Sequence, residues 1–219
     1  TVVPMAFPIR FNRHDLLFID PASGGIDAAC DADGALIAEW LAAGRPVIVR
    51  RPGLVFGGAG VHCGIPLPPD QGKKRIGFIV SRRAIKRQTG LPGLQECMAH
   101  LSRSRQAHAA GLLESCQKNG LFPEVFGSLA WQRLTGLAYL HDDSDIDLRF
   151  KVENQGELAR LSTALQKHRL LCHALFDVEV ELWNGRAFSW REFTNDSRET
   201  MIKTINDVFL MKKALLPMG

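Results

Sequence analysis

Hydrophobic and polar positions along the first half of the chain follow short periodic runs, with Pro and Gly at the breaks between them. The run DGALIAEWLAAG (33–44) is typical of a short helix that ends at Gly44. RPVIVRRPG (45–53) and RIGFIV (75–80) predict strands, whereas GGAGVHCGIPLPPDQG (57–72) predicts a loop. We therefore expect a first module of mixed α and β structure.

The second half begins with a mostly helical stretch over about 96–120, interrupted by the polar run SRSRQAHAAG (102–111). Downstream, the apolar spacing in GELARLSTALQKHRL (156–170) predicts an amphipathic helix. Two strands flank that helix, DIDLRF (145–150) and ALFDVEVELW (174–183), each with polar and apolar residues in alternation. The predicted fold class is α+β in two modules: residues 1–95, and residues 96–219 with a mixed sheet and flanking helices.

Composition limits the protein class. The 219 residues are 46% hydrophobic, which is enough to build a core, and no run approaches the roughly eighteen apolar residues of a membrane span. The five cysteines are scattered and never form a CxxC pair, which indicates reduced thiols rather than a disulfide framework or a zinc site. The amino end lacks the pattern of a secretory signal, so we expect a cytoplasmic protein with no membrane partner.

The two parts of the chain differ in charge. Residues 1–120 carry 15 Lys and Arg against 9 Asp and Glu, whereas residues 121–219 carry 12 against 14. The basic excess concentrates in GKKRIGFIVSRRAIKR (72–87), where a solvated cationic face and a surface for an anionic partner are comparable interpretations. The basic residues of this run are not interleaved with aromatic residues, since its one aromatic residue, Phe78, lies in the apolar stretch between them, so a nucleic-acid partner is not expected.

The most specific chemical pattern lies in the second module. Gly127 and Ser128 open a helix-compatible run, and Asp145 and Asp147 follow on a predicted strand, where period-two alternation places both carboxylates on one face. Two like charges at this spacing repel each other, and either a cation or solvent must offset that repulsion. Mg²⁺ prefers such oxygen ligands and often shares them with substrate phosphates. The glycine backbone and the serine hydroxyl would bind those phosphates.

A third carboxylate is expected on the next acidic strand. Asp177, Glu179 and Glu181 alternate there with apolar residues, so one face of the strand is acidic. Alone, this pattern is also typical of a solvent-facing edge strand. Beside the Asp-x-Asp strand we predict Asp177 as the third ligand, with Glu179 as the alternative, because one sequence does not fix the register.

These residues resemble a known superfamily. Gly127-Ser128, then Asp145-Ile146-Asp147, then a later acidic strand is similar to the nucleotidyltransferases typified by DNA polymerase beta, although the gap between the two motifs is longer here. A narrower resemblance, to the phosphoribosyl-dephospho-CoA transferases that act as holo-acyl-carrier-protein synthases of malonate decarboxylase, covers nearly the whole chain. It rests on HDLLFIDP, RPVIVRRP, GSLAWQRLTGLAYLHDDSDIDL, DVEVELWNGRAFSWREF and MIKTINDVFLMKK, in that order.

The resemblance implies a polymerase-beta-like catalytic domain and a specific reaction. A serine of the malonate decarboxylase acyl-carrier protein would attack 2'-(5''-triphosphoribosyl)-3'-dephospho-CoA, and diphosphate would leave. Asp145, Asp147 and Asp177 would be catalytic and would hold one or two Mg²⁺ ions. Gly127 and Ser128 would bind the outer phosphates.

Three further assignments depend on the same resemblance. Lys203 in MIKT matches a lysine of the family's carboxy-terminal motif and is a candidate phosphate contact, although a plain surface lysine is equally consistent. Carrier proteins are generally acidic, so the basic module would dock the carrier or bind the phosphates of the prosthetic-group precursor. The docking residues would be Arg82, Arg83, Lys86 and Arg87. Two alternatives stay open: a nucleotidyltransferase of another specificity, and a non-catalytic binding module.

Overall fold

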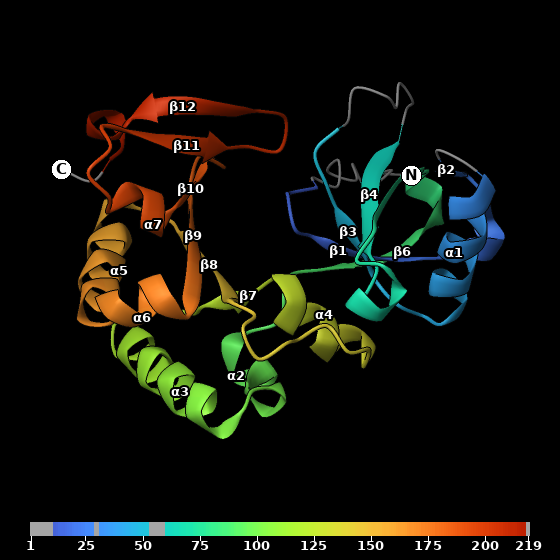
Figure 1. Ribbon diagram of the computed structural model, residues 1–219. Helices are drawn as coiled ribbons and strands as arrows, with labels where there is room; N and C mark the ends of the chain where they lie inside the picture. Colours follow the sequence, from blue (N-terminus) through green and yellow to red (C-terminus); the bar gives the residue numbers. More distant parts are fainter. Residues whose placement is uncertain (1–10, 29–30, 53–59, 218–219) are drawn as a thin grey trace, which may run out of the picture. The chain divides into compact units, whose positions relative to one another are not determined.

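The protein is described by a computed structural model that covers residues 11–28, 31–52 and 60–217 (Figure 1). Contacts divide the chain into two compact units, one of residues 1–66 and 75–90 and the other of residues 67–74 and 91–219. Each unit contains its own six-stranded sheet, and helices accompany both sheets. The predicted α+β class with two modules is confirmed. The first unit ends at Gly90 and the second resumes at Leu91, five residues before the expected boundary. The expected boundary between residues 95 and 96 stays a prediction.

The amino-terminal unit is an antiparallel sheet with one longer helix. Its strands lie in the order β2-β5-β4-β3-β1-β6, and α1 spans Asp31–Ala42. The strands are β1 (Leu16–Ile19), β2 (Ile26–Ala28), β3 (Val47–Val49), β4 (Val61–Pro66), β5 (Arg75–Val80) and β6 (Ile85–Thr89). Alternate residues of β3, β4 and β5 are fully buried, among them Val47, Cys63 and Phe78. The opposite face of these strands is more open.

One predicted loop is a strand. Residues 61–66 form β4, which pairs antiparallel with β5 along its whole length, from Val61 opposite Val80 to Pro66 opposite Arg75. The Gly and Pro residues around this segment suggested a turn. The strand forms because Val61, Cys63 and Ile65 alternate into the core, and Pro66 lies at the strand end, where its missing N–H is tolerated. Residues 57–59 of the GGAG run lie outside the described residues.

The carboxy-terminal unit is a mixed sheet backed by helices. Its strands lie in the order β12-β11-β10-β9-β8-β7, and only the β8–β9 pair among them is parallel. The strands are β7 (Glu124–Val125), β8 (Ile146–Val152), β9 (Phe176–Leu182), β10 (Ala187–Ser189), β11 (Glu199–Lys203) and β12 (Val208–Lys212). The helices are α2 (Leu94–Cys97), α3 (Arg103–Gln117), α4 (Gly127–Thr135), α5 (Gln155–Lys167), α6 (Arg169–Ala174) and α7 (Trp190–Phe193).

The two faces of this second sheet differ in chemistry. Ile146, Leu148 and Phe150 of β8 are buried in one hydrophobic cluster with the apolar stripe of α5, which contains Leu158 and Leu161. The amphipathic helix predicted there is confirmed, with Asn154 as its N-cap. Because strand side chains alternate, the intervening polar residues of β8 and β9 share the other face. That polar face carries the candidate site.

Candidate functional site

Asp147 lies against the first turn of α4. Gly127 begins that helix with φ of 64°, and a Cβ built on it would overlap the Asp147 carboxylate, with the carboxylate carbon only 2.6 Å away. The Phe126 N–H donates to the Asp147 carbonyl at 3.0 Å, which ties the strand to the helix start. Glycine is therefore required at 127 for two reasons, the left-handed backbone and the close carboxylate. The Gly-Ser pair and the Asp-x-Asp strand meet as the sequence suggested.

Asp147 and Asp177 are direct neighbours across the parallel pair. The β8–β9 register places them opposite each other on the polar face, and both are half-buried. Adjacent strands lie about 4.8 Å apart, so the two carboxylates are in the range in which one divalent cation can bind both. Asp145 is exposed and lies one residue before β8.

Glu179 is already engaged by a lysine. Its Oε2 accepts from Lys203 Nζ at 3.1 Å, and the glutamate is only 3% exposed. This ion pair satisfies the Glu179 charge within the protein, whereas the Asp177 carboxylate makes no hydrogen bond or ion pair within the described part of the chain. The geometry favours Asp177 over Glu179 as the third carboxylate. Lys203 lies on the same face of the sheet, with β10 between its strand and β9.

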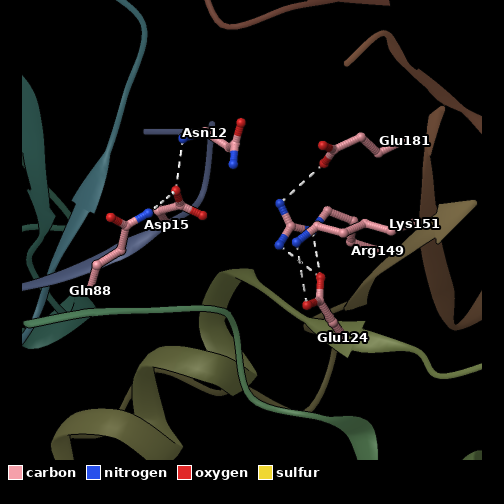
Figure 2. Close-up of polar contacts among 7 residues, drawn as sticks. All are labelled: Asn12, Asp15, Gln88, Glu124, Arg149, Lys151 and Glu181. Carbon is pink, nitrogen blue, oxygen red and sulfur yellow. Dashed lines mark hydrogen bonds and ion pairs between the residues drawn. The ribbon is translucent and has the colours of Figure 1, made fainter. Parts of the chain in front are cut away.

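A buried arginine completes this polar face, and the sequence reasoning missed it. Arg149 of β8 is fully buried and pairs with Glu124 of β7 at 2.7 Å and with Glu181 of β9 at 3.2 Å (Figure 2). Lys151 also approaches Glu124, at 3.6 Å. Arg149 therefore links β8 to β7 on one side and to β9 on the other. Its position two residues after Asp147, on the acidic face, was the signal that could have identified it.

The long segment between the two motifs has a structural role. Gly136 ends α4 with φ of 72°, and the Gln132 side-chain oxygen then accepts from the N–H groups of Tyr139 and Leu140 at 3.1 and 3.0 Å. Thr135 bonds back to the Trp131 carbonyl. Trp131 and Tyr139 are both buried, with ring centroids 6.4 Å apart, so they pack in the protein. The segment holds the chain returning to β8 against α4.

Ser128 and the predicted docking residues are accessible. Ser128 is half-buried in the first turn of α4. Arg82, Arg83, Lys86 and Arg87 are exposed in the amino-terminal unit, on or just before its edge strand β6. Two of them stack on aromatic rings, Arg82 over Phe11 and Arg87 over Phe18, and Lys86 pairs with Asp20 at 3.4 Å.

The donor set of this site fits a metal ion that shares its ligands with a substrate. Within the described residues, no group of three or more His, Cys, Asp or Glu side chains is close enough to hold a metal ion. The Asp147–Asp177 pair supplies two carboxylates, the number that Mg²⁺ commonly takes from a protein when substrate phosphates and water complete its shell. The residues therefore fit an ion that binds together with the substrate, and Mg²⁺ stays a prediction.

The described cysteines are buried, free thiols. Burial raises the pKa of Cys63, Cys97 and Cys116 to about 12 and that of Cys172 to about 11. Thiols in this state are neutral and unreactive near pH 7. Cys30 lies outside the described residues.

In the part of the chain that is described, no helix combines the length and the apolar character needed to cross a bilayer.

Comparison with known proteins identifies relatives over both units. Residues 12–90 match the family described as "Phosphoribosyl-dephospho-CoA transferase MdcG N-terminal domain", and residues 93–214 match the corresponding C-terminal domain. A phosphoribosyl-dephospho-CoA transferase of Xanthomonas campestris pv. campestris is 34% identical over 94% of this chain and 96% of the relative. The protein of the same name from Bradyrhizobium diazoefficiens is 32% identical over 92% and 90%. No solved structure matches the chain significantly.

Proposed function

The chain belongs to the phosphoribosyl-dephospho-CoA transferase family and is a transferase, and we propose that its acceptor is the acyl-carrier protein of malonate decarboxylase. In the proposed reaction, a carrier serine hydroxyl attacks the innermost phosphorus of the triphosphate on 2'-(5''-triphosphoribosyl)-3'-dephospho-CoA. A phosphodiester forms, and the bond to the outer two phosphates breaks to release diphosphate. We also propose a cytoplasmic location, which the free buried thiols support.

One observation carries this proposal: a half-buried carboxylate pair, Asp147 and Asp177, lies in register beside the start of α4. Bound Mg²⁺ would neutralise phosphate charge and polarise the reacting phosphorus. Asp147 and Asp177 would hold the ion, and a ligand role for Asp145, which is exposed one residue before β8, stays a prediction. Asp177 is also positioned to accept the proton of the incoming serine, since it has no protein donor in the described chain.

The triphosphate would be held by the groups around the carboxylates. The N–H groups opening α4 point toward the helix start, where the macrodipole favours negative charge, and the Ser128 hydroxyl adds a donor. Lys203 has three ammonium donors, one of which goes to Glu179. Its ammonium charge would attract a phosphate on the same sheet face. Catalysis would depend mainly on positioning and charge neutralisation, as in other phosphoryl transfers.

We assign carrier docking to Arg82, Arg83, Lys86 and Arg87, which are exposed and face solvent with a net positive charge. Replacing all four by Gln would raise the KM for the carrier and flatten its salt dependence, because steering by surface charges is screened by salt. The KM for the nucleotide substrate serves as the internal control. A carrier KM that is unchanged across salt concentrations would reject this assignment.

A substrate comparison tests the reaction itself. The enzyme with Mg²⁺ and the carrier is offered ATP, CTP or the triphosphoribosyl precursor, and release of diphosphate is measured. Turnover with the precursor alone supports the proposal. Turnover with ATP or CTP would instead indicate a nucleotidyltransferase of another specificity, and loss of turnover in folded D147N would exclude a non-catalytic binding module.

A further inference from the structure

On one face of the amino-terminal sheet, two paired glycines form a floor beneath an arginine side chain. Gly64 of β4 and Gly77 of β5 are directly paired in the antiparallel ladder, so neither strand projects a side chain at this point. The Arg50 side chain, which follows β3, lies across both glycines. A Cβ on Gly77 would overlap Arg50 Nη1 and would stand 3.0 Å from its central carbon, and a Cβ on Gly64 would stand 3.6 Å from Arg50 Cδ.

The Arg50 guanidinium has unused donors. It is half-buried, yet within the described part of the chain it makes no hydrogen bond or ion pair. A guanidinium carries five N–H donors and stays charged, and a partly buried charge without an acceptor is costly unless something else supplies one. Its stem is fixed by the glycine floor, and its backbone N–H is fixed by the His62 carbonyl at 2.9 Å. The donors are therefore held in place in advance.

The surroundings of Arg50 are suited to an anion. The strands β3, β4 and β5 contain no Asp or Glu, and Arg75, two residues before Gly77, adds a second cation on the same face. His62, next to Arg50 across the β3–β4 pair, has its pKa lowered by burial and by the Arg50 charge, so its ring is neutral at pH 7. The first carboxylate on this face is Asp27, beyond β5, opposite Ile79.

We propose that Arg50, on the floor formed by Gly64 and Gly77, binds a phosphate group of dephospho-CoA. The planar fork of a guanidinium matches two oxygens of a phosphate, which a lysine ammonium does not. The identity of the ligand rests on the proposed function, whereas the existence of an anion site rests on Arg50 and the two glycines beneath it. The amino-terminal unit thereby gains a substrate-binding role in addition to carrier docking.

The test measures equilibrium binding to the full-length protein by isothermal titration calorimetry. The probes are dephospho-CoA, which lacks the triphosphate that the catalytic carboxylates would bind, and inorganic diphosphate as a free source of phosphate. The variants are Arg50→Gln, Arg50→Lys and Gly77→Ala, and the last keeps the charge but displaces the guanidinium. The matched control is Arg45→Gln, which removes a guanidinium that stacks on Trp40 instead. Thermal unfolding reports whether each variant is folded.

We expect Arg50→Gln to weaken dephospho-CoA binding about ten-fold or more, the effect of losing a charged hydrogen-bonding partner. Gly77→Ala should weaken binding in the same direction, Arg50→Lys should weaken it less than Arg50→Gln, and Arg45→Gln should leave it unchanged. A wild type that does not bind dephospho-CoA, or folded Arg50 and Gly77 variants within two-fold of wild type, would overturn the proposal. The proposal would also be overturned if inorganic diphosphate binds in an Arg50-dependent way and dephospho-CoA does not.

Failure of this site and failure of the proposed function give different results. If wild type transfers the prosthetic group but the Arg50 and Gly77 variants keep the wild-type Kd for dephospho-CoA, the site is wrong and the function stands. If dephospho-CoA binding depends on Arg50 but no carrier is modified, the site stands and the proposed acceptor reaction is wrong.

Discussion

Substitutions of two glycines at opposite ends of α4 separate the cost of backbone strain from the cost of moving the carboxylate of Asp147, which we propose to be catalytic. Gly127 and Gly136 have φ of 64° and 72°, so alanine at either position is forced into the left-handed region, which costs about 1–2 kcal/mol. Their surroundings differ. A Cβ at 127 would overlap the Asp147 carboxylate, whereas a Cβ at 136 would meet nothing within 4 Å.

G127A and G136A should therefore cause similar losses of stability but very different losses of activity. G136A should lower the free energy of unfolding by about 1–2 kcal/mol and leave kcat nearly unchanged. G127A should show at least that loss of stability and a fall in kcat of about 10²-fold, the effect of a catalytic group displaced by about 1 Å. Urea unfolding and steady-state transfer kinetics on both variants are the measurements. Equal effects of the two substitutions on kcat would refute the placement of Asp147 at the start of α4.

Three further predictions concern single side chains. D177N should lower kcat by about 10²-fold or more without loss of Tm. E179Q should lower kcat by less than ten-fold and should lower Tm, because Glu179 forms the ion pair with Lys203. Equal losses of kcat in the two variants would assign the third ligand to Glu179. R149M should destabilise the protein by about 2–3 kcal/mol in urea, somewhat below the 3–5 kcal/mol of a fully buried pair because both glutamates are partly exposed; a cost below about 1 kcal/mol would contradict a structural role. Burial raises the pKa of Cys63 from 9.0 to about 12, so the folded state keeps a proton that the unfolded state loses above pH 9, and stability falls as pH rises. C63A should reduce the loss between pH 8 and pH 10 by about 1 kcal/mol, and an unchanged slope would contradict this cause.

The alternating pattern of the second module determined most of what the sequence could predict. Ile146 and Leu148 are buried and Asp147 is not, as period-two alternation requires, and the stripe of α5 packs in the same core. Alternation assigns a residue to a face, but it does not say which residue of the neighbouring strand lies opposite. The parallel register that pairs Asp147 with Asp177 depends on packing between the whole strands.

Two features of the polar face were beyond local reasoning. Glu179 forms an ion pair with Lys203, 24 positions later in the chain, and no spacing rule connects two such distant residues. Alternation places Arg149 on the acidic face, two residues after Asp147, but its burial and its partners Glu124 and Glu181 do not follow from local sequence, because arginine is ordinarily an exposed residue. In the first module, β4 was missed because its glycine and proline are typical of loops in isolation, while its pairing with β5 is a long-range contact.

The mass of the carrier subunit after reaction tests the central claim most directly. The protein is incubated with the malonate decarboxylase acyl-carrier subunit, the triphosphoribosyl precursor and Mg²⁺, and the intact carrier is weighed by mass spectrometry. The account predicts the increment of one phosphoribosyl-dephospho-CoA group with wild type, and none with D147N or with a carrier that lacks its acceptor serine. An unmodified carrier with wild-type protein, under conditions where a known transferase of the family modifies it, would contradict the account.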